Sequence, residues 1–381
     1  MPSELSPIAA AKLATSAYVP HANTGASGNT QRRLVRDAAQ SVAPGLDYGG
    51  MTLLEGVTGP GVRAPFGFVA HGTSGSWAGD TVVCIRGTSS VPDWLTNVYF
   101  PRANGPSGHA VHKGFNGLAG SLVPQIRSAM RGRNPSRIHV IGHSLGGAAA
   151  TLVAESIHGM GGTKLYTFGA PRAGTWPHSS HVTNAIGADN IYRAYHDTDI
   201  VPMVPIFPYT HNPAGQTAYL LTGHGHILSI HTHLMPQYEG SMTSSWRSLP
   251  VISHRRFSLD TVDDVLKEAG HIPNGFLSSL LLRLLTRALQ LILRAAGGVV
   301  GLAAFGAFTI IDQLVVAMQR LARMGAAAAE QVMELVRQIA RFLGITLREG
   351  GNITAQFLRW IIDRLVQTIV NMAAAAVRGL S

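Results

Sequence analysis

The sequence predicts an α/β fold with a mostly parallel central sheet flanked by helices, followed by an all-α region. The first observation is the strand-forming run Ile138–Ile141, which leads into a glycine-bounded turn and then an Ala-rich helical pattern ending near Ile157. Strand, tight turn and helix in this order are typical of parallel sheets. The second observation is a change of composition after His254, beyond which helical periodicity dominates.

The turn itself, Gly142-His143-Ser144-Leu145-Gly146, has the pattern of a nucleophile elbow. Such an elbow is a strained strand-to-helix turn that exposes one serine. Glycine at its two ends leaves room for backbone crossings that a Cβ atom would obstruct. The following helix directs its N-terminal dipole and free N–H groups at the place where an oxyanion would form. We therefore predict that Ser144 is a nucleophile.

A serine hydroxyl becomes reactive when a histidine takes its proton and an acid orients that histidine. The elbow predicts that the acid and the histidine follow in that order. Ile191–Tyr195 predicts a buried strand, and a polar turn with Asp197 and Asp199 comes directly after it. Catalytic groups collect at the carboxyl ends of such strands. Both aspartates fit by position, and the other one would be a turn-former or a supporting group.

The histidine lies in a histidine-rich part of the chain after these aspartates. A metal site is the alternative for such a cluster, because histidine is the commonest metal ligand. However, no His-Glu-x-x-His helix accompanies it, and Cys84 is the only cysteine. We therefore expect no metal ion and no other cofactor. The candidates are His211, His224, His226, His231, His233 and His254.

Four segments of the chain carry a family resemblance, in the order in which they occur. They are Val83–Ser90 with Asp93-Trp94-Leu95, then Val111–Phe115, then the serine elbow, and finally Asp199–Pro202 with Pro205. Together they resemble class 3 lipases, an α/β-hydrolase family that includes secreted fungal triacylglycerol lipases and many bacterial phospholipases. The resemblance covers residues 1–254 and implies an α/β hydrolase there.

The resemblance also assigns site residues. It implies that the acid is Asp199, directly before Ile-Val-Pro, and that the histidine is His233, a few residues before Tyr238, with His231 as the alternative. The elbow places one oxyanion donor at the backbone N–H of Leu145. The second donor is Thr88 by resemblance.

A lid is expected after Thr88, over residues 91–100. Its apolar face could cover an acyl pocket in water and turn outward at a lipid surface. The alternative is a surface helix packed permanently on the core. The apolar residues of this segment are Val91, Trp94, Leu95 and Val98.

For a chain that resembles lipid hydrolases, composition and charge favour an anionic membrane surface as partner. Only 13% of the residues are charged, and the net charge is +10 with a pI of about 10.2. We expect no nucleic-acid partner, because no nucleic-acid motif or lysine-rich tract accompanies this charge. A lipid substrate at an anionic membrane surface fits better. The N-terminus, Met1–Ser6, lacks the basic and apolar regions of a signal peptide, so we expect a product made in the cytoplasm and exported, if at all, by a non-Sec route.

The rest of the chain divides into a linker helix and breaker at 255–275 and a helical domain at 276–381. Arginine and glutamine stripes oppose broad Leu/Ile faces over Phe276–Arg294, Glu330–Arg341 and Gln356–Gln367, which predicts at least three amphipathic helices. The uncharged stretch Ala295–Ile311 is of borderline length for a membrane span. Membrane insertion or surface association and a soluble, chaperone-bound bundle both fit this pattern.

These inferences combine into a lipase or phospholipase that hydrolyses carboxyl esters of membrane glycerolipids through an acyl-enzyme on Ser144. A lipase with a helical tail resembles bacterial lipase effectors delivered into rival cells, which implies a secretion apparatus or an immunity protein as further partners. In the alternative interpretation the helical domain carries the function, as a membrane-inserting or scaffold protein.

Overall fold

The structure is a computed structural model that describes residues 4–57, 63–88, 101–206, 208–215, 218–222, 225–252, 261–295, 310–347 and 354–379. Its central sheet has the strand order β1-β2-β3-β6-β7-β9-β11-β12. The run from β3 to β11 is parallel, whereas β1, β2 and β12 pair antiparallel at the edges. The strands are β1 (Thr52–Val57), β2 (Arg63–His71), β3 (Asp80–Ile85), β6 (Arg137–His143), β7 (Gly162–Phe168), β9 (Ile191–His196), β11 (Ala218–Leu221) and β12 (Val251–Ile252).

A small second sheet lies beside the main one, with the order β10-β8-β5-β4. Its strands are β4 (Arg102–Asn104), β5 (Ala110–His112), β8 (Gly174–Thr175) and β10 (Tyr209–Thr210). The central strand β3 forms because Val82–Ile85 are apolar on both faces, and every one of these side chains is buried. The mostly parallel sheet confirms the α/β-hydrolase fold class.

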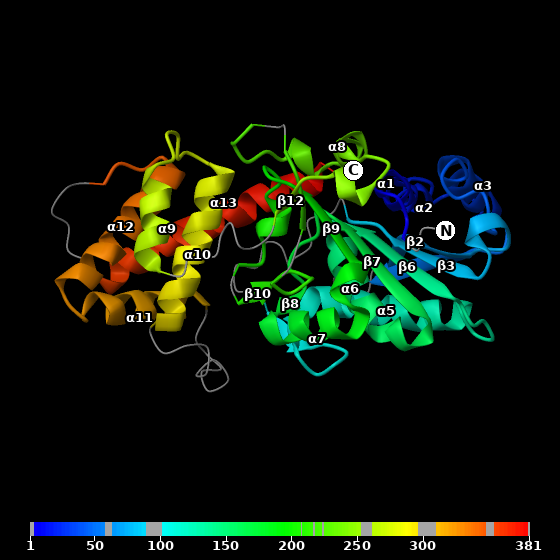
Figure 1. The fold of residues 1–381 in the computed structure, drawn as a ribbon, viewed down its shortest axis with the longest axis horizontal. Coiled ribbons are helices and arrows are strands. Elements are labelled where there is room, and N and C mark those ends of the chain that lie inside the picture. Colours follow the sequence, from blue (N-terminus) through cyan, green and yellow to red (C-terminus); the bar gives the residue numbers. More distant parts are fainter. Residues whose placement is uncertain are drawn as a thin grey trace.

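Helices cover both faces of the main sheet (Figure 1). On one face α1 (Pro7–Ser16), α2 (Val19–Ala22), α3 (Gly28–Ala39) and α8 (Met235–Ser241) lie over a core that includes Phe68, Tyr166 and Tyr238. On the other face lie α5 (Lys113–Ala129), α6 (Leu145–Ile157) and α7 (Trp176–Ile186). Short 3₁₀ turns connect these elements: η1 (Gly75–Trp77), η2 (His158–Met160), η3 (Ala188–Asn190), η4 (Val201–Met203), η5 (His231–His233) and η6 (Trp246–Ser248).

The C-terminal region is helical, as the sequence predicts. Its helices are α9 (Val262–Gly270), α10 (Ser279–Ala295), α11 (Ile310–Ala322), α12 (Ala326–Leu343) and α13 (Ala355–Arg378). In Figure 1 the first four form a bundle beside the sheet, and α13 runs from this bundle back to the α/β part, where the chain ends near α8. α13 therefore bridges the two parts of the molecule.

The structure differs from the sequence expectations in two details of this region. The helix predicted as a linker, α9, begins at a Thr261 cap and packs into the bundle through the buried residues Val265, Leu266 and Ala269. In addition, one apolar core cluster continues across the predicted boundary between residues 254 and 276. The two parts of the chain therefore share an apolar core. The division into domains at these residues remains a prediction.

One described helix, α13, is long and apolar enough to cross a membrane. In the fold, 56% of its most apolar window is buried against other parts of the chain. A core helix of a soluble protein has the same length and composition, so this finding alone does not indicate a membrane span. The borderline stretch Ala295–Ile311 lies almost entirely outside the described residues.

Candidate active site

Ser144 occupies the turn between β6 and α6, with φ 55° and ψ −133°. A positive φ is strained for any residue other than glycine. Any side chain at the two flanking glycines would clash with the backbone. A Cβ at Gly142 would lie 2.3 Å from the carbonyl oxygen of Gly146, and a Cβ at Gly146 would lie 2.2 Å from the carbonyl oxygen of Arg86. The turn therefore has the geometry expected of a nucleophile elbow.

His233 lies between Ser144 and Asp199. Its Nε2 atom is 2.8 Å from Ser144 Oγ, and its Nδ1 atom is 2.8 Å from Asp199 Oδ2. All three side chains are fully buried. Because a carboxylate only accepts hydrogen bonds, the proton of the neutral imidazole sits on Nδ1, and Nε2 is left to accept the serine proton. The arrangement can activate a serine for attack on a carbonyl carbon.

Two further donors fix the Asp199 carboxylate. The Tyr238 hydroxyl donates to Oδ2 at 2.6 Å, and the Val201 backbone N–H donates to Oδ1 at 2.9 Å. Burial, together with the charge of Asp199, raises the pKa of Tyr238, which therefore remains a donor. Gly169 approaches the same group, since a Cβ there would lie 2.8 Å from Asp199 Oδ2.

A second hydrogen-bond chain runs from the N-terminal helices to the backbone of His233. The Gly87 N–H donates to Tyr18 Oη at 2.9 Å, and Tyr18 Oη is 2.6 Å from His143 Nδ1. His143 Nε2 is in turn 2.8 Å from the His233 carbonyl oxygen. Burial lowers the pKa of His143 well below its usual range, and the nearby His233 lowers it further, so His143 is neutral. One proton arrangement satisfies the chain: Tyr18 donates to Nδ1, and Nε2–H donates to the carbonyl.

The two predicted oxyanion donors lie where the elbow meets the end of β3. Leu145 is the first residue of α6, and Thr88 is buried two residues beyond the buried Arg86. A Cβ at Gly87 would lie 2.8 Å from Ser144 Cβ, so this segment packs directly against Ser144. Arg86 anchors the segment by donating from Nε to the Pro65 carbonyl at 2.7 Å. The oxyanion role of Thr88 and Leu145 remains a prediction.

The alternatives considered from the sequence lie in other surroundings. His231 is exposed at the start of η5, two residues from the buried His233. Asp197 lies in the turn after β9, where its backbone N–H donates to the Leu221 carbonyl at 3.0 Å. The predicted lid residues Val91, Trp94, Leu95 and Val98, and the histidines His224 and His254, lie outside the described residues.

Sequence reasoning missed Tyr18, His143 and Gly169 as parts of the site and used Tyr238 only as a landmark for His233. The motif Gly-His-Ser already contained His143, but nothing nearby indicated its partner. Tyr18 and His143 are 125 residues apart in the chain. A hydrogen bond across such a distance leaves no local pattern.

Comparison with known proteins identifies lipases as similar proteins. The sequence model of the family described as Lipase (class 3) matches residues 82–209. A secreted mono- and diacylglycerol lipase of Fusarium solani is 35% identical over 164 residues, which are 41% of this chain and 49% of that protein. A lipase of Rhizomucor miehei is 30% identical over 150 residues, covering 36% and 41% of the two chains. The chain thus spans about half the length of these relatives or less.

Among solved structures, the chain is similar to a mono- and diacylglycerol lipase from Aspergillus oryzae, with 23% identity and a TM-score of 0.46 over 65% of this chain and 84% of that one. The relatives correct one expectation. We expected a product made in the cytoplasm and exported by a non-Sec route, whereas the relatives from Fusarium solani and Penicillium cyclopium are named as secreted lipases. The segment from residue 82 to residue 209, which contains Ser144 and Asp199, is the part of the chain that matches the class 3 lipase family.

Proposed function

We propose that this protein is a serine lipase that hydrolyses carboxyl esters of mono-, di- or triacylglycerols. The observation that carries the proposal is the contact of His233 with both Ser144 Oγ and Asp199 Oδ2, each at 2.8 Å, in a fully buried elbow. The names of the relatives as mono- and diacylglycerol lipases support the substrate class.

The chemistry follows from the positions of these atoms. Ser144 Oγ attacks the ester carbonyl carbon while His233 Nε2 takes the hydroxyl proton. The N–H groups of Leu145 and Thr88 stabilise the oxyanion, and Asp199 stabilises the imidazolium. His233 then gives its proton to the departing alcohol oxygen, which leaves an acyl-enzyme. Water attacks this ester with His233 again as base, and the fatty acid leaves as Ser144 regains its proton.

The test is a pair of serine variants. Ser144→Ala should abolish ester hydrolysis and labelling by a fluorophosphonate, with little change in folding, because the hydroxyl supplies chemistry rather than packing. Ser16→Ala is the matched control, since Ser16 is also fully buried but its hydroxyl donates to the Leu13 carbonyl. Labelling that survives in Ser144→Ala would refute the assignment.

We further propose that the enzyme works at a membrane surface, on glycerophospholipids as well as acylglycerols, as a toxin effector would. Its net charge of +10 supports this, as do two exposed apolar side chains: Met324, beside Arg323 in the turn between α11 and α12, and Trp360 on α13. Exposed apolar side chains and positive charge together favour anionic lipid surfaces.

Mass spectrometry of products separates these substrate classes. Wild type and Ser144→Ala are incubated with neutral acylglycerol emulsions and with anionic phospholipid vesicles. If wild type releases free fatty acid from the emulsion but not from the vesicles, acylglycerols are substrates and the proposed activity on phospholipids is refuted. Vesicle leakage that is equal for both proteins would instead favour the alternative function, in which the helical region acts without catalysis.

A further inference from the structure

The C-terminal helices contact the segment that carries the acid. Arg283, in the first turns of α10, donates from Nη2 to the carbonyl oxygen of Asp197 at 2.6 Å. Its guanidinium carbon also lies 5.6 Å from the centre of the Tyr195 ring, on which Arg193 stacks at 4.5 Å. Arg283 therefore holds the turn that begins at the end of β9 and reaches Asp199 two residues later.

The start of α10 also pairs with the segment that leads to the histidine. The Leu228 N–H donates to the Leu277 carbonyl, and the Ser279 N–H donates to the His226 carbonyl, both at 2.9 Å. The Ser229 N–H then donates to the Thr198 carbonyl at 2.9 Å, next to Asp199. The acid turn, the histidine segment and α10 are thus connected to one another by backbone hydrogen bonds.

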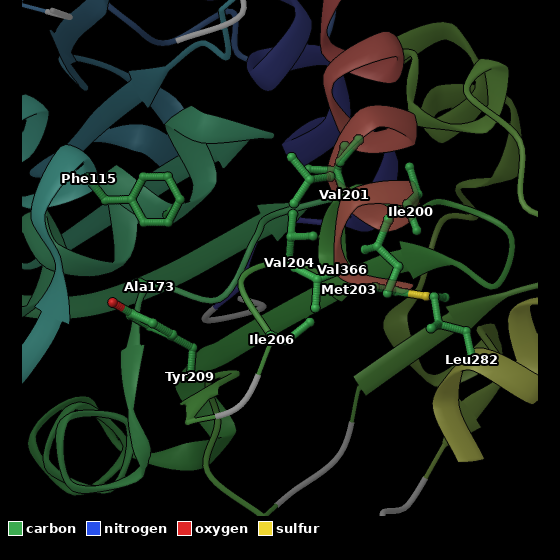
Figure 2. Packing of buried hydrophobic residues seen from close by; sticks show 14 of the residues in the cluster. Phe115, Ala173, Ile200, Val201, Met203, Val204, Ile206, Tyr209, Leu282 and Val366 are labelled. Carbon is green, nitrogen blue, oxygen red and sulfur yellow. The ribbon is translucent and has the colours of Figure 1, made fainter. Parts of the chain in front are cut away.

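Apolar packing by α13 supports the same two segments. Figure 2 shows Val366 of α13 close to Val204 and Met203, and Leu282 of α10 close to Met203, within one buried cluster. The cluster residues Ile200–Val204 come directly after Asp199 in the chain. At the other end of α13, a Cβ at Gly379 would lie 3.6 Å from Leu234 Cδ2, one residue after His233. The buried residues Val201 and Met203 of η4 therefore pack against the C-terminal helices.

We propose that the C-terminal helices are part of the catalytic unit and that Arg283 is a positioning residue for the triad. The inference rests on the proposed ester hydrolysis. Arg283 does not touch the reacting atoms; it acts through the Asp197 carbonyl on the turn that sets the place of Asp199. A displacement of about 1 Å at a catalytic group costs about 100-fold in rate. Loss of this contact should therefore slow turnover rather than weaken substrate binding.

The experiment uses the full chain and a small soluble ester. Arg283→Ala, Arg283→Lys and wild type are compared with Arg364→Ala, which removes an exposed arginine from α13 as a matched control. Titration with a fluorophosphonate gives the fraction of active sites, so that kcat is expressed for each competent molecule. A purely structural role would lower that fraction and leave kcat per site unchanged.

We expect kcat per titrated site to fall about 10-fold to about 100-fold in Arg283→Ala, with little change in KM. Arg283→Lys should recover part of the loss because lysine keeps a donor, and Arg364→Ala should match wild type. An unchanged kcat per site in Arg283→Ala, or an equal loss in Arg364→Ala, would overturn the inference. A wild type that neither hydrolyses the ester nor takes the label would instead refute the proposed function.

Discussion

Replacing Tyr18 by phenylalanine tests the hydrogen-bond chain that joins the N-terminal helices to the active site. The substitution removes one oxygen atom from a buried position. That oxygen accepts from the Gly87 N–H at 2.9 Å and donates to His143 Nδ1 at 2.6 Å. Burial raises the pKa of Tyr18, so the hydroxyl is a donor throughout the usual pH range. Phenylalanine fills the same space and leaves both neighbours without this partner.

The magnitude follows from the groups that lose their partner. A buried polar group left without a hydrogen bond costs about 1–3 kcal/mol, so two such groups cost about 2–6 kcal/mol at most. The substitution should also raise the activation free energy of ester hydrolysis, because both neighbours of Tyr18 contact proposed catalytic groups. Gly87 precedes the proposed oxyanion donor Thr88, and His143 Nε2 lies 2.8 Å from the His233 carbonyl oxygen. Complete loss of an oxyanion donor costs about 10²-fold to 10³-fold. Partial displacement should lower kcat by about 10-fold.

Steady-state hydrolysis of a soluble ester and thermal unfolding measure the two effects. Tyr48→Phe is the control, since the buried Tyr48 hydroxyl donates to the Ala43 carbonyl at 2.8 Å and takes no part in the chain through His143. It should lose about 0.5–1.5 kcal/mol of stability and keep its kcat. If Tyr18→Phe keeps the wild-type kcat, or if both variants lose activity equally, the chain through His143 has no role in placing the catalytic groups.

Two further predictions concern single residues. Asp199→Asn and His233→Ala should each lower kcat by orders of magnitude, whereas Asp197→Asn and His231→Ala should lower kcat little. An inactive His231→Ala variant would show that His231, and not His233, is the general base. For His112, which caps α5 by accepting from the Gly114 N–H, burial lowers the pKa to about 4 from 6.5. The unfolded state therefore binds this proton first, and up to about 3 kcal/mol of stability is lost as the pH falls from about 6.5 to about 4. His112→Asn keeps a capping side chain but does not titrate in this range. Its free energy of unfolding, measured with denaturant, should fall less than that of wild type between about pH 6.5 and about pH 4. An equal fall in both proteins would show that His112 is not the source of the pH dependence.

Local features of this fold could be predicted from the sequence, and long-range ones could not. The elbow was predictable because strand, glycines and helix are neighbours in the chain. Position alone left Asp197 and Asp199 open, since both follow β9, and only the family resemblance preferred Asp199. The pattern that indicates His233 is looser than the elbow, because it consists only of a spacing of a few residues before Tyr238.

The contacts made by Tyr18 and Arg283 had no local signal. Arg283 reaches a carbonyl 86 residues earlier, and an arginine stripe on an apolar helix predicts a solvated face or a lipid contact equally well. The burial of α9 was missed because an amphipathic helix has the same pattern on a surface as in a bundle. Which elements pack together depends on the whole topology.

The strained backbone of Ser144 has a consequence for the stability of the protein. Its conformation costs about 1–3 kcal/mol, and the surrounding hydrogen bonds, from Ser144 N–H to the Phe168 carbonyl at 3.0 Å and from Gly147 N–H to the Ser144 carbonyl at 2.8 Å, hold it in place. Glycine would adopt the same turn without that cost. The strain at Ser144 is therefore a local cost that the rest of the fold offsets, and it is the cost of holding a serine, rather than a glycine, at this turn.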